Sequence, residues 1–198
     1  MTIARTDLIL LLTVVAAGLA CGCMEASSSP GAHLPGEGGI VDLGSDYVPP
    51  KYTLSEALLE LDAYAAGDVL DAGDLYDTGN MTIRRMQGAG VDADGRAASW
   101  MLGVEQGDAN MWLAYGAGGW RVIPWNAPFR GEAIVLEECM NPADLYALHR
   151  APIGEMLERH GASQTDLALA DGVYEVSVHA PAGFEVLAFS ADTGGVIA

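Results

Sequence analysis

The sequence is poor in basic residues, in cysteine and in histidine. Its 198 residues include 9 lysines and arginines against 27 aspartates and glutamates, so the formal net charge is −18. Lys51 is the only lysine. A surface of this charge repels the phosphates of nucleic acids and the anionic faces of membranes, which excludes a nucleic-acid partner. Three cysteines are too few for a disulfide framework.

The chain also lacks the common catalytic motifs. It contains no H-E-x-x-H, no G-x-S-x-G and no P-loop. The four histidines are scattered, and Cys139 has no partner base nearby in the sequence. We therefore predict no catalytic residue, no cofactor and no enzymatic activity. A hydrolase whose site has no recognisable motif is the alternative that stays open.

No apolar run is long enough to cross a membrane as a helix, which needs about 20 residues. The run "LILLLTVVAAGLA", residues 8–20, carries no charge, and it follows a short polar start that contains Arg5. This length is typical of the apolar region of an export signal peptide. Residues 24–50, which follow, are rich in Ser, Pro and Gly, a composition typical of a linker.

Two cysteines lie between the apolar run and the linker, in "LACGC". This stretch resembles the lipobox of prokaryotic lipoproteins, in which small residues precede a cysteine that receives lipid. The resemblance implies lipidation of Cys23, with Cys21 as the alternative. It also implies a signal peptide at 1–22, a tether at 23–50 and an extracytoplasmic domain at 51–198. The protein would then be anchored to the outer face of the cell membrane. One C-x-C pair supplies only two of the four ligands that structural zinc requires.

Helix and strand signals alternate within 51–198, with possible sub-units at 51–140 and 141–198. Thr53 and Glu56 form a capping box before a helix that ends near Gly67. A second helix spans 141–161, with Asn141 as its cap and a kink or split at Pro152. Strands are expected at 81–87, 96–106, 111–116 and 120–125, at 132–140 as a strand or sheet edge, and in a C-terminal hairpin at 172–191. The predicted class is α+β, an antiparallel sheet covered on one face by two or three helices, with two tandem helix-plus-sheet units as a variant.

Three groups of residues are candidate sites. Four carboxylates recur at every third position and could bind calcium, but the absence of the EF-hand pattern favours a turn-rich acidic loop: they are Asp68, Asp71, Asp74 and Asp77. Four tryptophans could line a ligand groove or pack one face of a curved sheet: they are Trp100, Trp112, Trp120 and Trp125. Asn80 begins an N-x-T sequon and is a possible glycosylation site.

The C-terminal stretch "VYEVSVHAPAGFEVLAFSADTGGVIA" resembles the end of a PepSY-type unit, in which a hairpin and a D-x-x-T/S-G-x-V/I motif close a small sheet. Asp192, Thr193, Gly194 and Val196 correspond to this motif. The stretches "GRAASWMLGV" and "GWRVIPW" resemble exported archaeal lipoproteins. These resemblances imply an extracytoplasmic, non-catalytic domain, and the PepSY resemblance adds regulation of a peptidase. Our hypothesis for the function is binding of a protein, peptide or envelope component. A cell-surface receptor for a small ligand or cation is the alternative.

Overall fold

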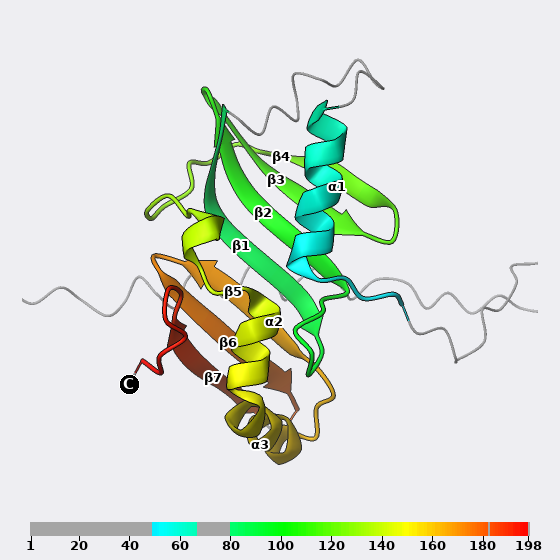
Figure 1. The fold of residues 1–198 in the computed structure, drawn as a ribbon, viewed down its shortest axis with the longest axis vertical. Coiled ribbons are helices and arrows are strands. Elements are labelled where there is room, and N and C mark those ends of the chain that lie inside the picture. The colour runs from blue at the N-terminus through cyan, green and yellow to red at the C-terminus, as the bar shows by residue number, and fades with distance from the viewer. Residues whose placement is uncertain (1–48, 67–79, 182, 198) are drawn as a thin grey trace, which may run out of the picture. The chain divides into compact units, whose positions relative to one another are not determined.

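The computed structural model describes residues 49–66, 80–181 and 183–197. These residues form one seven-stranded antiparallel sheet with the strand order β4-β3-β2-β1-β5-β6-β7 (Figure 1). The strands are β1 (Met81–Val91), β2 (Ser99–Gln106), β3 (Ala109–Gly116), β4 (Gly119–Trp125), β5 (Thr165–Ala170), β6 (Val173–Ala180) and β7 (Gly183–Ser190).

Two runs of antiparallel hairpins build the sheet, since β1 to β4 and β5 to β7 each follow one another along the chain. Glycine and aspartate shape the tight turns, and Asp171 and Gly172 between β5 and β6 both have positive φ, 52° and 73°. Both values suit a two-residue hairpin turn of the primed type. The two runs are joined where β1 pairs with β5, from Met86 opposite Leu169 to Val91 opposite Thr165. We call this pairing the β1–β5 seam.

Helix α1 (Leu54–Ala66) begins with the capping box that the sequence predicts. The backbone N–H of Thr53 donates to Glu56 Oε2 at 2.7 Å, and the backbone N–H of Glu56 donates to Thr53 Oγ1 at 3.1 Å. Leu54 and Leu61 are buried and Leu58 is half-buried, so these three side chains form the apolar face of α1.

The second predicted helix is split in two, as the proline at position 152 suggests. Helix α2 (Pro142–Leu148) is capped by the Asn141 side chain, which accepts from the backbone N–H of Ala143 at 2.9 Å. Helix α3 (Arg150–His160) ends at Gly161 in the left-handed conformation. The break at His149 places Pro152 in the first turn of α3, where its missing N–H costs no hydrogen bond.

A single hydrophobic core lies between the sheet and the three helices. Its largest fully buried side chains come from both hairpin runs and from α2 and α3, among them Trp100, Tyr146, Tyr174, Phe189 and Met86. Figure 1 shows α1 over the β1–β4 part of the sheet and α2 and α3 over the β5–β7 part. We call the side toward the helices the inner face and the opposite side the outer face.

The segment between β4 and α2 differs from the expectation. Residues 132–140 were expected as a strand or sheet edge, but they contain one short turn of 3-10 helix, η3 (Leu136–Glu138), in an otherwise irregular path. Ile134 N–H donates to the Ile83 carbonyl oxygen at 2.7 Å. This contact holds the segment beside the start of β1 without forming a strand ladder.

The predicted α+β class is wrong, because the described structure is 45% strand and 24% helix. It is a β-rich fold, a wide sheet with three short helices, and not a sheet covered by helices. Two differences shift the balance toward strand. The sequence does not predict β5, and β1 continues past Gly88 and Gly90 to Val91.

Candidate functional site

The four tryptophans lie on opposite faces of the sheet, so they do not line one groove. Trp100 is fully buried and Trp120 is 8% exposed, both on the inner face. The indole N–H of Trp100 donates to the carbonyl oxygen of Tyr52 at 2.9 Å, and that of Trp120 donates to the carbonyl oxygen of Ala57 at 2.8 Å. These two side chains therefore attach α1 and the residues before it to the sheet.

Trp112 and Trp125 lie on the outer face, together with Phe129 from the segment after β4. The Trp112 and Phe129 rings meet edge to face with centroids 5.1 Å apart. The Trp125 and Phe129 rings stack at 6.4 Å with an interplanar angle of 17°. Both arrangements are favourable for aromatic pairs. Trp125 remains 45% exposed, and its strand neighbour Ile123 is 37% exposed. We call Trp112, Ile123, Trp125 and Phe129 the outer aromatic patch.

The local sequence explains how the patch forms. Ile123 and Trp125 alternate with Pro124 along β4, and Trp112 is the cross-strand partner of Ile123. Gly103, on β2, lies opposite Trp112, on β3. A Cβ at position 103 would be 2.7 Å from Phe129 Cε1. The absence of a side chain on Gly103 thus lets Phe129 lie flat against the strand.

Charge around the patch contrasts with the acidic chain as a whole. Arg121 is exposed on the same side of β4 as Ile123 and Trp125, and Arg130 is exposed next to Phe129. Arg84, from β1, pairs with Glu105, with its Nε 2.7 Å from Glu105 Oε2. The outer aromatic patch is therefore an apolar surface with two flanking cations.

Cavities follow the segment between β4 and α2 on the inner side. One has a volume of about 430 Å³ and lies between α1, the strands β1 to β3 and residues 133–137. Two smaller ones, of about 340 and 190 Å³, lie along residues 132–142. Cys139 borders both smaller cavities. Burial, and then the charges of Glu138 and Asp192, raise the pKa of its thiol, so it is a poor nucleophile at neutral pH.

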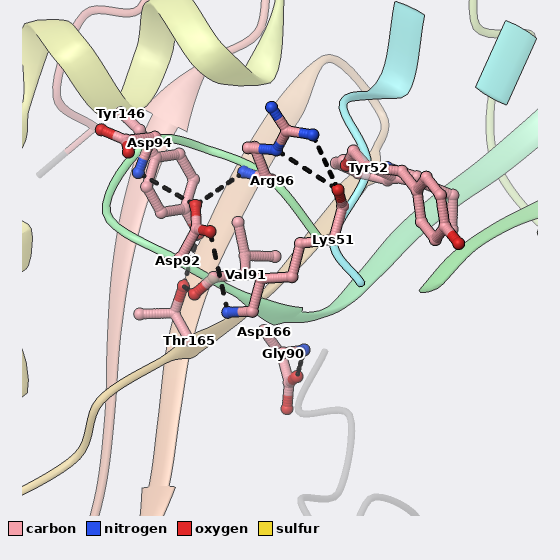
Figure 2. Close-up of polar contacts among 11 residues, drawn as sticks. Lys51, Tyr52, Gly90, Val91, Asp92, Asp94, Arg96, Tyr146, Thr165 and Asp166 are labelled. Carbon is pink, nitrogen blue, oxygen red and sulfur yellow. Dashed lines mark hydrogen bonds and ion pairs between the residues drawn. The ribbon is translucent and has the colours of Figure 1, made fainter. Parts of the chain in front are cut away.

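A polar cluster surrounds the turn between β1 and β2 (Figure 2). Asp92 Oδ1 accepts from the backbone N–H groups of Asp94 and Arg96, each at 3.0 Å. The Arg96 guanidinium donates to the Lys51 carbonyl oxygen at 2.8 Å. Nearby, the hydroxyls of Tyr146 and Thr165 lie 2.5 Å apart, connecting α2 with β5. These contacts tie the chain entry, the β1–β2 turn, α2 and β5 together, so we assign the cluster a structural role.

His149, between α2 and α3, and His160, at the end of α3, each have a polar partner from the C-terminal part of the chain. His149 Nε2 lies 2.6 Å from the Gly194 carbonyl oxygen, and its ring stacks on Phe189. His160 Nε2 lies 2.9 Å from Glu185 Oε2, and Arg159 binds the other oxygen of Glu185 at 2.5 Å. Hydrogen bonds from Arg159 and then His160 lower the pKa of Glu185. Within residues 49–66, 80–181 and 183–197, no group of three His, Cys, Asp or Glu side chains is placed to bind a metal ion.

Several predicted site residues fall elsewhere. Cys21, Cys23 and the four aspartates Asp68, Asp71, Asp74 and Asp77 lie outside the described residues. Asn80 is exposed directly before β1, an accessible position for the sequon. Of the helices in the described part of the chain, none has both the length and the apolar character needed to span a bilayer.

Sequence reasoning missed Phe129 and the division of the tryptophans. A signal for the division is present, since Trp120 and Trp125 stand an odd number of residues apart on one strand and must face opposite sides. Phe129 follows the strand, where no periodicity places a side chain.

Comparison of the chain with protein-family models, with curated proteins and with solved structures found no match in any of the three.

Proposed function

We propose that this chain is a lipid-anchored cell-surface protein whose folded domain binds a protein or peptide partner through the outer aromatic patch. The observation that carries this proposal is the exposure of Trp125 and Ile123 beside Trp112 and Phe129 on the outer face. A large apolar side chain that stays 45% exposed, although an aromatic neighbour is at hand, is suited to an anchor for a binding partner.

The composition of the patch favours a polypeptide partner. Trp, Phe and Arg are enriched at protein interfaces, and Trp and Arg dominate binding hot spots. Aromatic rings supply a large contact area at a small cost in conformational entropy. The stacked Trp125 and Phe129 rings are already ordered in the free protein, so a partner would not have to organise them.

The free edge of the sheet at β4 offers a partner strand few backbone donors, because this edge strand contains Pro124. Proline has no N–H to donate to an added strand. We therefore expect the partner to bind over the side chains of the outer face and not to extend the sheet at β4.

The export and anchoring part of the proposal rests on the sequence. The apolar run at 8–20, the "LACGC" stretch and the linker composition of 24–50 agree with a lipoprotein whose domain is held away from the membrane. The resemblance of the C-terminal hairpin to a PepSY unit suggests a peptidase or its substrate peptide as the partner class to examine first.

The binding proposal is tested by cross-linking the anchored full chain in its own cell envelope. We expect Trp125→Ala to lose the cross-linked partner, since alanine removes the exposed ring. Phe184→Ala is the matched control, because Phe184 is an aromatic residue that is 60% exposed on β7, away from the patch. A partner captured equally by both variants and the unmodified chain would show that the patch is not the binding surface.

The anchoring proposal is tested separately by mass spectrometry of the mature N-terminus. We expect a chain that begins at Cys23 or Cys21 and has gained the mass of attached lipid. Recovery of an intact chain that begins at Met1 and has no lipid would refute the anchor, whatever the outcome of the cross-linking.

A further inference from the structure

The cavity between α1, the strands β1 to β3 and residues 133–137 has a mostly apolar lining. Its volume of about 430 Å³ falls in the range of small-molecule sites, roughly 300–1,000 Å³. Leu102, Leu113 and Val104 form its floor and are at most 1% exposed. The walls add side chains from α1, from the start of β1 and from the segment after β4: they are Leu58, Leu61, Met81, Ile83, Ala133, Ile134, Val135 and Leu136.

Carboxylates stand on two sides of this apolar interior. Asp62 comes from α1 and Glu137 comes from η3, and both are exposed lining residues. Because their side chains reach solvent while the floor is buried, the charges lie at the mouth of the cavity. Thr82 adds one hydroxyl to the lining. Among the residues that the structure describes, no basic side chain lines this cavity.

We propose that the cavity binds an amphiphilic cation, with an alkyl or similar apolar body inside and an ammonium group between Asp62 and Glu137. Apolar cavities bind apolar ligands more readily than water, which finds no hydrogen-bond partners there. At about 30 Å³ for a group the size of a water molecule, the volume holds on the order of a dozen such groups. The two carboxylates favour a cationic head over an anionic one.

The wall of the cavity formed by residues 133–137 is exposed to solvent. Ala133 and Val135 are exposed, and Val135 is 47% exposed. Two hydrogen bonds hold this wall: the Ile134 N–H donates to the Ile83 carbonyl oxygen at 2.7 Å, and the Glu132 N–H donates to the side-chain oxygen Asp171 Oδ1 at 3.0 Å. The site lies on the inner side of the sheet, so it is independent of the outer aromatic patch and of the partner proposed for that patch.

The test is calorimetric titration of the full chain with dodecyltrimethylammonium below its micelle concentration, in physiological salt. We expect one bound molecule per chain and at least tenfold weaker binding of dodecyl sulfate. Ala133→Phe should weaken binding of the cation at least tenfold, because the ring enters the mouth of the cavity. Ala127→Phe is the matched control on the same segment, since Ala127 is exposed and does not line the cavity.

A second pair of variants separates specific from general charge attraction. Asp62→Asn combined with Glu137→Gln should weaken binding of the cation. Glu155→Gln combined with Glu175→Gln removes the same charge from exposed positions on α3 and β6 and should leave binding unchanged. Equal losses in the two double variants, equal binding of the cation and the sulfate, or tight binding by a folded Ala133→Phe chain would each overturn the proposal.

Discussion

Gly88 is a core position where even an alanine side chain should destabilise the fold. It lies in the middle of β1 opposite Trp100, and a Cβ built on it would be 2.6 Å from Trp100 Cζ3 and 3.1 Å from two further ring atoms. Real Cβ atoms do not approach other atoms this closely, so the ring or the strand has to move. The ring has little room, because Trp100 is fully buried and its indole N–H is bonded to the Tyr52 carbonyl oxygen.

The size of the effect follows from three terms. Overpacking a core by one methyl group costs about 1–3 kcal/mol, and loss of the Trp100–Tyr52 hydrogen bond adds about 1 kcal/mol. Alanine in a strand gains about 0.5–1 kcal/mol over glycine from the backbone. We therefore expect Gly88→Ala to lower the free energy of unfolding by about 1–3 kcal/mol, or the Tm by about 3–10 °C.

Two other glycines supply controls for this experiment. Gly118 in the β3–β4 turn and Gly154 in α3 have no atom within 4 Å of a built Cβ. Gly118→Ala should be close to neutral, and Gly154→Ala should stabilise α3 by about 0.5–1 kcal/mol. The assay is thermal unfolding followed by near-ultraviolet circular dichroism, which reports the packing of the tryptophans. A Gly88→Ala chain as stable as the unmodified one, with the same spectrum, would refute the reasoning.

Two further predictions concern titratable side chains. Hydrogen bonds from the backbone N–H of Thr53, and then from its hydroxyl, lower the pKa of Glu56 below its ordinary 4.5. The stability that Glu56 adds to the folded state is therefore present above that pH and is lost as the pH falls through the lower folded pKa. Glu56→Ala should cost about 0.5–1 kcal/mol in urea unfolding at pH 7 and nothing well below pH 4, and a loss independent of pH would contradict this origin. Burial, and then Glu138, raise the pKa of Cys139, so iodoacetamide should alkylate it more slowly in the folded than in the unfolded chain. Site-resolved mass spectrometry measures both rates, and equal rates would count against a shielded thiol.

Local signals in the sequence predict the elements well where one short motif decides the outcome. The Thr53–Glu56 capping box and the Asn141–Pro142 start are both found, because each depends on side chains a few residues apart. The β2, β3 and β4 strands are also found, since short turns with glycine or asparagine separate alternating apolar runs. The break before Pro152 follows from the missing N–H of proline alone.

Features decided by distant contacts were not predictable. β5, "TDLALA", is only six residues long and becomes a strand because it lies between β1 and β6. Conversely, "EAIVLEECM" has strand-like residues, but the described structure gives it no strand partner, only the Ile134–Ile83 bond at this edge. The outer aromatic patch needs Phe129, whose position depends on Gly103 two strands away from β4. The cavity of about 430 Å³ depends on the path of residues 133–137 beside α1 and β1, and no sequence periodicity specifies that path.

The β1–β5 seam has a consequence for how the chain reaches this structure. Every other ladder in the described sheet joins strands that are consecutive along the chain, whereas the seam joins Met86 to Leu169 and Val91 to Thr165 across nearly half the chain. The consecutive hairpins can close early and quickly, while the seam requires closure of a long loop. Until β5 has been synthesised and has paired, β1 presents an open edge to any other strand nearby. We therefore expect substitutions along the seam to slow folding and to promote aggregation more than equally destabilising substitutions inside either hairpin run.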